Sequence, residues 1–231
     1  EVRRQVIGAI IVLSLAAVGF GLAFFLRGPG YHLYKADLQK SSINYFGEST
    51  SAPTKVNGVA VLRNQSIIRG QSVFQPVSAL EQGIACIQQY KKSKDPSLLH
   101  IAESELQLLN DAYPVNSRGE RWITYAFPFA LHQQQSLTIN PPWNSGMAQG
   151  LAVELSTSLY SITGAQSFLQ LAKEYFAPLE HVIKEKDLTK APRFVTFMDP
   201  GGYLWFEEYA GDISPMRVIN GHLYATLGIY D

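Results

Sequence analysis

The sequence predicts a mainly α-helical protein: an α/α toroid of helical hairpins with short β loops, preceded by one transmembrane helix. Two observations support this fold class. Residues 6–26 contain no charged side chain and are almost wholly apolar. From residue 74 onward, apolar residues recur at helical spacing in successive pairs of segments. We therefore expect an N-terminal flank over residues 1–5, a transmembrane anchor over 6–26, a stalk with short strands over 27–73 and a helical domain over 74–231.

The apolar run is long enough to cross a hydrocarbon core of about 30 Å at about 1.5 Å per residue. A cleavable signal peptide is the alternative, but its apolar region usually has about 7 to 15 residues and ends at small residues. Here the run closes on Phe24-Phe25-Leu26-Arg27. Basic residues flank both ends, so charge counting leaves the orientation open. We expect an uncleaved anchor in a single-pass membrane protein.

Charge and cysteine content exclude several functions. The chain has 19 basic and 19 acidic residues, and residues 28–231 carry a formal charge of −2. Nonspecific nucleic-acid binding needs a strong basic excess, so we expect no nucleic-acid partner. Cys86 is the only cysteine, which rules out an intrachain disulfide and a cysteine-based metal cluster. No spacing of His, Asp and Glu predicts a metal site, and we expect no cofactor.

Two helices are predicted directly after residue 74. Pro76 suits the first turn of a helix that runs to Tyr90, and the two lysines that follow favour its C-terminal end. A second helix comes after a short connection at Asp95-Pro96, so the pair should pack as an antiparallel hairpin. The apolar positions of the second helix recur at steps of three and four and share one face: Leu99, Ala102, Leu106, Leu109 and Tyr113.

A second hairpin and a fifth helix are predicted further along. Gly164 separates the two helices of this hairpin, Pro178 should kink or restart the second of them, and the fifth helix begins after Pro215. Their apolar positions are Ala148, Leu151, Leu155, Leu159 and Ile162, followed by Phe168, Leu171, Ala172 and Tyr175. Aromatic loops over residues 122–131 and 194–209 contain short alternating stretches typical of strands. Hairpins joined by such loops describe a toroid whose loops line a cleft at one end.

Four short motifs, in order, carry a family resemblance. They are Phe74-Gln75-Pro76-Val77 with Gln82-Gly83, Ser145-Gly146-Met147-Ala148-Gln149-Gly150, Glu207-Glu208-Tyr209, and Asn220-Gly221 with Leu227-Gly228-Ile229-Tyr230-Asp231. With these motifs, residues 74–231 resemble the C-terminal domain of D-glucuronyl C5-epimerases. The second motif is similar to the family's Ser-Ala-Met-Ala-Gln-Gly signature, with Gly146 in place of Ala.

The resemblance implies an isomerase that converts D-glucuronate residues to L-iduronate within a polysaccharide, as in heparan sulfate and heparin-type biosynthesis. The partner would be a glucuronate-containing polysaccharide. The helical domain would lie on the lumenal or extracytoplasmic side of the membrane, in the Golgi of a eukaryote. Family members continue beyond the last motif into a region with further tyrosines implicated in catalysis, and animal members also carry a larger β domain ahead of the helices. We therefore expect a compact relative, incomplete at its C-terminus, and the sequence leaves a homodimer open.

Two catalytic residues are predicted. Inverting a carbon beside a carboxylate needs acid/base groups on both faces, and donors or cations that stabilise an enolate-like intermediate. The family resemblance predicts Tyr209 as one acid/base, with Glu208 holding or deprotonating it. Burial and like-charge pressure within this aromatic run favour a raised carboxyl pKa. The alternative is that Tyr209 is a packed aromatic residue whose hydroxyl is satisfied by the fold.

Four further residues are predicted to bind substrate, each with a structural alternative. Gln149 and Asn220 would hydrogen-bond a sugar or its carboxylate, or else cap a helix or bridge loops. Trp143 would stack on a sugar ring, or else pack in the core. Arg217 would contact an anionic group, or else be a solvated surface arginine.

Two other functions compete with epimerisation. A polysaccharide lyase on a related toroid would share proton abstraction at C5 but eliminate the 4-linked sugar. A membrane-anchored glycan-binding protein would bind the polymer without turnover. Product analysis separates these three functions, since only a lyase yields an unsaturated uronate that absorbs in the ultraviolet.

Overall fold

The computed structural model describes residues 54–56, 59–61, 65–68, 71–131, 137–191 and 193–230, with side chains from residue 74 onward. The predicted flank over residues 1–5 and the predicted anchor over 6–26 lie outside these ranges. Within them, no helix is both long enough and apolar enough to cross a membrane. The described part is mainly helical with short strands, which confirms the coarse fold class, while the closed toroid and the anchor stay predictions.

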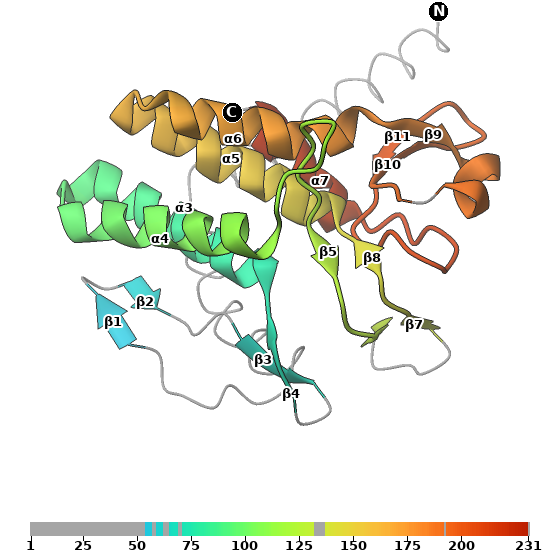
Figure 1. Ribbon diagram of the computed structural model, residues 1–231, viewed down its shortest axis with the longest axis horizontal. Coiled ribbons are helices and arrows are strands. Elements are labelled where there is room, and N and C mark those ends of the chain that lie inside the picture. Colours follow the sequence, from blue (N-terminus) through green and yellow to red (C-terminus); the bar gives the residue numbers. More distant parts are fainter. Residues whose placement is uncertain are drawn as a thin grey trace, which may run out of the picture. The chain divides into compact units, whose positions relative to one another are not determined.

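Five α-helices form the body of the described part. The first hairpin consists of α3 (Pro76–Ser93) and α4 (Pro96–Ala112), and the second of α5 (Gly146–Thr163) and α6 (Gln166–Phe176). The fifth helix is α7 (Ile219–Tyr230). The two hairpins stack as neighbouring layers (Figure 1), with α5 packed against α3, α6 and α7. The predicted order of helices is confirmed.

Local sequence explains where these helices begin and end. Proline occupies the first turn of both α3 and α4, where its missing N–H costs nothing. The Asp95 carboxylate accepts a hydrogen bond from the Ser97 N–H at 2.9 Å, and Ser145 caps α5 in the same way through Ala148. Gly164 ends α5 with a φ of 68°, a left-handed conformation that glycine adopts without strain.

Pro178 acts as predicted at the end of the second hairpin. It lies in the short 3₁₀ helix η3 (Ala177–Glu180), which directly follows α6. A second short helix, η4 (Glu185–Lys190), follows after one strand.

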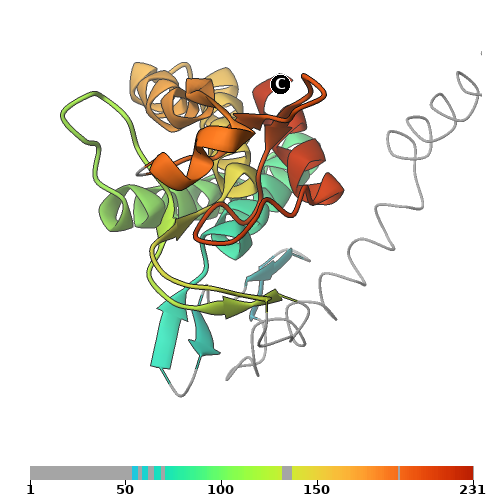
Figure 2. The ribbon, with the colours of Figure 1, turned by 90° about the vertical axis from the view of Figure 1, so that its right-hand side faces the viewer.

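The strands are short and mostly paired as hairpins. The antiparallel pairs are β1 (Thr54–Val56) with β2 (Val59–Val61), β3 (Gln65–Ile68) with β4 (Gln71–Phe74), β5 (Thr124–Tyr125) with β8 (Trp143–Asn144), and β6 (Phe129–Ala130) with β7 (Thr138–Ile139). In a three-stranded sheet, β10 (Thr196–Met198) lies between β11 (Leu204–Phe206), which is antiparallel to it, and β9 (Val182–Lys184), which is parallel. The strands expected in the two aromatic loops are therefore present. The pairs β3–β4 and β6–β7 lie on the side of the helices away from α6 (Figure 2).

The core lies between the two hairpins and around α5. Helix α5 buries residues on nearly all sides, because it has neighbours in α3, α6 and α7. On α4 the predicted face is confirmed at Ala102, Leu106 and Leu109, which are fully buried. At the start of that face the prediction was wrong by one residue: Leu98 is buried, whereas Leu99 is only half-buried. Leu98 precedes Ala102 by four residues, so it lies on the same helix face as the later buried positions.

Candidate active site

Glu208 and Tyr209 lie between β11 and α7, on a segment whose backbone is fixed at both sides. The Glu207 N–H donates to the Val195 carbonyl at 2.8 Å, and the Glu207 carbonyl accepts from the Gly146 N–H at 2.7 Å. Just beyond the pair, Ala210 exchanges two backbone hydrogen bonds with Asn144, at 2.8 and 2.9 Å. The two candidate side chains therefore start from a backbone held by Val195 directly before β10, by β8 and by the start of α5.

The Tyr209 ring lies on a group of buried aromatic side chains. It stacks on Phe129, with ring centroids 5.5 Å apart, and lies tilted against Trp143 at 5.9 Å. Trp143 in turn stacks on Tyr125, with centroids 3.9 Å apart and an interplanar angle of 10°. The Trp143 indole N–H donates to the Phe127 carbonyl at 2.8 Å. These contacts fix the direction in which the half-buried Tyr209 side chain extends.

The Tyr209 hydroxyl donates a hydrogen bond to the Glu208 carboxylate. The other carboxylate oxygen, Oε2, is buried against Gly221 in the first turn of α7 and has no hydrogen bond of normal geometry within the described residues. The pKa of Glu208 is raised to about 7, mainly by burial and also by the nearby Glu207, although the Tyr209 hydroxyl and the Gly221 N–H act to lower it. A carboxyl that titrates near neutral pH can both accept and return a proton.

Glu207 has a different role from its neighbour. It is fully buried, and its carboxylate accepts hydrogen bonds from two backbone N–H groups, Tyr209 at 3.3 Å and Arg217 at 3.0 Å. Burial raises its pKa, and these two backbone donors lower it. Glu207 therefore stabilises the loop after β11 by accepting backbone hydrogen bonds, whereas Glu208 is the acid that contacts the Tyr209 side chain.

Gln149 lies in the core, and both polar atoms of its side-chain amide form hydrogen bonds within the fold. The residue is completely buried. Its Nε2 donates to the carbonyls of Arg121 at 3.0 Å and Tyr175 at 2.7 Å, and its Oε1 accepts from the Ile123 N–H at 2.7 Å. The amide joins α5 to the loop before β5 and to the end of α6. This placement matches the structural alternative for Gln149, because no polar atom of the side chain reaches solvent.

The other three predicted binding residues are placed differently from one another. Trp143 is 3 % exposed, so its ring faces are covered by protein and not open to a sugar. The Arg217 guanidinium pairs with the Glu185 carboxylate at 2.5 Å and lies over the Phe197 ring. Asn220 is exposed in the first turn of α7, next to Gly221. Only Asn220 is therefore both close along the chain to the Glu208 contact and open to solvent.

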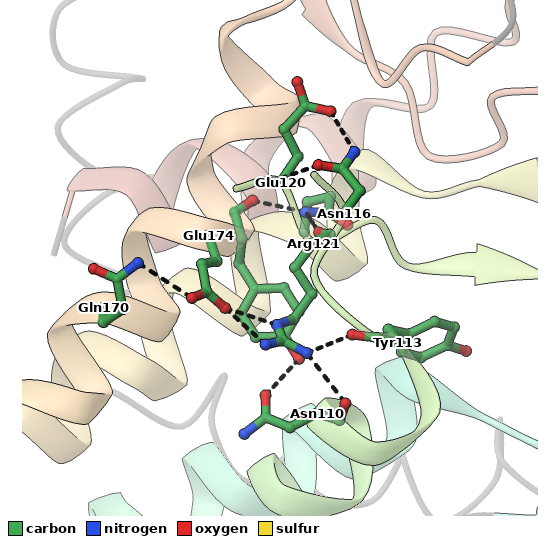
Figure 3. A network of polar contacts seen from close by, with 9 residues as sticks. Asn110, Tyr113, Asn116, Glu120, Arg121, Gln170 and Glu174 are labelled. Carbon is green, nitrogen blue, oxygen red and sulfur yellow. Dashed lines mark hydrogen bonds and ion pairs between the residues drawn. The ribbon is translucent and has the colours of Figure 1, made fainter. Parts of the chain in front are cut away.

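A buried ion pair holds the loop before β5, and sequence reasoning did not find it. The Arg121 guanidinium binds Glu174 of α6 with two hydrogen bonds, at 3.0 and 2.7 Å, and donates to the carbonyls of Asn110 and Tyr113 (Figure 3). Arg121 is buried and paired, so it is neither a solvated surface arginine nor free to bind a polyanionic ligand. Its partner is 53 residues away, so no local pattern could reveal it.

Glu120 lies next to this pair and stays ionised. Burial raises its pKa, but hydrogen bonds from Trp122, Asn116, His181 and Arg118 outweigh burial and lower the pKa to about 2. The His181 Nε2 is 2.7 Å from the carboxylate, and the His181 ring stacks on Trp122. Glu120 therefore ties the loop before β5 to the end of η3. Within the described ranges, no three His, Cys, Asp or Glu residues gather in a way that could hold a metal ion.

His222 is a further functional-site neighbour that carried no prediction. Its Nδ1 accepts a hydrogen bond from the Phe206 N–H at 3.1 Å, and its ring stacks on the Phe206 ring. Burial lowers the pKa of His222. A neutral ring with an accepting Nδ1 joins α7 to β11, directly before the Glu208 loop.

Comparison with known families agrees with this geometry. Residues 118–231 match the family model described as D-glucuronyl C5-epimerase C-terminus. Over these residues, slightly under half of the chain, the protein is similar to the C-terminal domain of D-glucuronyl C5-epimerases, which confirms the resemblance seen in the sequence. All six predicted site residues lie inside the match. The first motif, around Phe74, lies before it and is not tested by it.

Proposed function

We propose that this protein catalyses epimerisation at C5 of D-glucuronate residues within a polysaccharide of the heparan sulfate or heparin type, giving L-iduronate. The match of residues 118–231 to the epimerase family model supports this class of reaction. The observation that carries the proposal is the hydrogen bond between the Tyr209 hydroxyl and Glu208, whose pKa is raised to about 7. It joins a group suited to proton transfer with carbon to a carboxyl that can take up a proton near neutral pH.

In the proposed step, the C5–H bond breaks as the Tyr209 oxygen takes that proton. The proton that Tyr209 already carried passes along its hydrogen bond to Glu208. The electron pair left at C5 is shared with the adjacent carboxylate as an enolate-like intermediate. A proton from solvent, added at the opposite face, inverts the centre, and Glu208 releases the proton that it took up to solvent. Tyr209 and Glu208 thus serve one face of the sugar, and the same two transfers run in reverse when Tyr209 donates.

The substrate contacts proposed here are narrower than the set predicted from sequence. Asn220 is exposed beside the Glu208 contact, so we propose that it hydrogen-bonds the sugar or its carboxylate. Arg217 would contact an anionic group of the polymer by exchanging its present partner Glu185. The polymer is the proposed partner, and a second copy of the chain stays an open alternative.

We also propose that residues 6–26 anchor the protein and that the helical domain lies on the lumenal or extracytoplasmic side, in the Golgi of a eukaryotic cell. The uncharged apolar run supports the anchor, and the family analogy supports the side. Protease treatment of sealed vesicles tests this topology. Protection of the helical domain is expected, and cleavage from the cytoplasmic face would contradict the proposal.

Isotope exchange tests the proposed reaction. The protein is incubated with a desulfated glucuronate polymer in deuterated water, and deuterium at C5 is measured. We expect label at C5, and about 100-fold less label or lower with Tyr209→Phe, which is the usual scale for a positioned acid/base. Tyr203→Phe is the matched control, because Tyr203 is 68 % exposed on the β10–β11 turn and should leave exchange unchanged.

Other products would point to other functions. A rise in ultraviolet absorbance from an unsaturated uronate would indicate a lyase. Polymer binding without exchange or cleavage would indicate a glycan-binding protein. Unchanged exchange with Tyr209→Phe would return Tyr209 to a packing role.

A further inference from the structure

Helix α7 packs on α5 through residues that have almost no side chain. At Gly150 of α5, a Cβ atom would lie 2.8 Å from the Ala225 carbonyl oxygen, and at Gly228 of α7 a Cβ would lie 2.6 Å from the Gly150 carbonyl carbon. Both distances are too short for real carbon atoms, so larger residues would push the helices apart. The glycines therefore set the close approach of α7 to α5.

A second contact fixes the start of α7 against β11. It is the hydrogen bond from the Phe206 N–H to His222 Nδ1, with the stacked Phe206 and His222 rings beside it. Together, the packing on α5 and this contact define the place of the first turn of α7. Gly221 lies in that turn, next to His222 and buried.

Gly221 faces Glu208 directly. A Cβ atom at Gly221 would lie 2.6 Å from the Glu208 Cβ and 2.9 Å from its Cδ, and it would also overlap with Oε2. Gly221 has no positive φ, unlike Gly119, Gly164 and Gly202. Its lack of a side chain is therefore required for space and not for backbone conformation.

We propose that Gly221 is a positioning residue for the acid/base pair: its bare backbone makes the space in which the Glu208 carboxylate lies, so that the other carboxylate oxygen meets the Tyr209 hydroxyl. This inference rests on the proposed function, and it gives a role to Gly221, the residue of the Asn220-Gly221 motif that has none in the proposed reaction. The buried Oε2 that faces Gly221 without a normal hydrogen bond agrees with a position imposed by space.

Two consequences follow for the variant Gly221→Ala. The added methyl group meets the Glu208 Cβ as well as the carboxylate, so the Glu208 segment must move away from α7, and the carboxylate moves with it toward solvent. Displacement also lengthens the hydrogen bond to Tyr209. A misplacement of about 1 Å can cost on the order of 100-fold in rate, and we expect a loss of at least about 10-fold in C5 exchange.

The first test does not depend on activity. The Glu208 carboxyl is titrated by carbon NMR, with the resonance assigned by its loss in Glu208→Gln. The wild-type pKa is expected at about 7, and Gly221→Ala should lower it toward the ordinary value of 4.5, because burial is the main cause of the raised value. Thr226→Ala, an exposed change one turn further along α7, should leave it at about 7. An unchanged pKa in Gly221→Ala overturns the inference, whatever the outcome for the reaction.

The second test separates positioning from a general defect. If Gly221 acts through Glu208, adding Gly221→Ala to Glu208→Gln should cost less than about 3-fold further in exchange, because residues in contact are not additive. If the exchange rate of the double variant falls by the product of the losses of the two single variants, the inference is overturned. Full exchange by Glu208→Gln would instead remove Glu208 from the proposed reaction, while the pKa test of Gly221 would still stand.

A third variant keeps the test decisive if Gly221→Ala does not fold. Glu208→Gly removes the atoms that the new methyl group would meet, so the double variant should fold when Glu208→Gly alone does. Continued unfolding of the double variant would show that the methyl group collides elsewhere and would overturn the inference.

Discussion

Replacing Gln149 by methionine should destabilise the protein strongly, because this buried amide forms hydrogen bonds with three backbone groups. The variant Gln149→Met keeps the length of the side chain and removes its polar atoms. The Ile123 N–H and the carbonyls of Arg121 and Tyr175 would each lose a partner inside the fold. A buried polar group left without a partner costs about 1 to 3 kcal/mol, so the expected loss is about 3 kcal/mol or more.

Urea unfolding followed by circular dichroism measures this loss. With a slope of about 1 to 3 kcal/mol per molar urea, the midpoint should fall by about 1 M or more. Gln166→Met is the matched control, because Gln166 is exposed at the start of α6 and its change should stay within about 0.5 kcal/mol. An unchanged midpoint for Gln149→Met, together with lost polymer binding, would refute the structural role and support the predicted substrate contact.

Two further changes have expected outcomes of their own. Glu105, buried in α4 and hydrogen-bonded by Gln82, has a pKa raised to about 7 by burial. Its contribution to stability is therefore full below about pH 4.5 and is lost as pH rises through about 7. We compare the free energy of unfolding of Glu105→Gln with that of the wild type, by urea unfolding at pH 4 and at pH 8. The difference should shift in favour of the variant by up to about 3 kcal/mol between pH 4 and pH 8, since one pKa unit is about 1.4 kcal/mol. An equal difference from wild type at both pH values would contradict this. Trp143→Phe should lower the maximal exchange rate by about 10-fold with little change in KM, because Trp143 supports the Tyr209 ring; a rise in KM alone would instead indicate sugar stacking.

The helices could be predicted because their signals are local. Apolar spacing gave the faces of α4 and α5, and Pro76, Gly164 and Pro178 marked ends that depend on backbone chemistry alone. The one-residue error at Leu98 and Leu99 arose where two adjacent leucines both fit the helical period. Tertiary packing against α3 decides between them, and spacing carries no information about it.

The site could be predicted only in part. Glu208 and Tyr209 are adjacent in sequence, so a motif could identify them, and the structure adds the hydrogen bond between them. Gln149 is in a motif too, but its amide is committed to three partners far along the chain. A motif identifies which residues matter to a family without saying whether each supports the fold or contacts the substrate.

Long-range polar contacts could not be predicted at all. Arg121 pairs with Glu174 and Arg217 with Glu185, at separations of 53 and 32 residues. The same holds for the contact between Gly221 and Glu208, which depends on how α7 packs on α5. Such pairs follow from the meeting of elements, and a single sequence shows only that charges and glycines are present.

The pH dependence of C5 exchange tests most directly whether Glu208 controls Tyr209. Glu208 must be ionised to take the Tyr209 proton, so the wild-type kcat/KM for exchange should rise with pH and level off above a midpoint at about 7. In Glu208→Gln the rate should be lower by about 100-fold, and this rise should be absent. The same midpoint in Glu208→Gln as in wild type would show that another group titrates, and would contradict the assignment of Glu208 and Tyr209 as the acid/base pair.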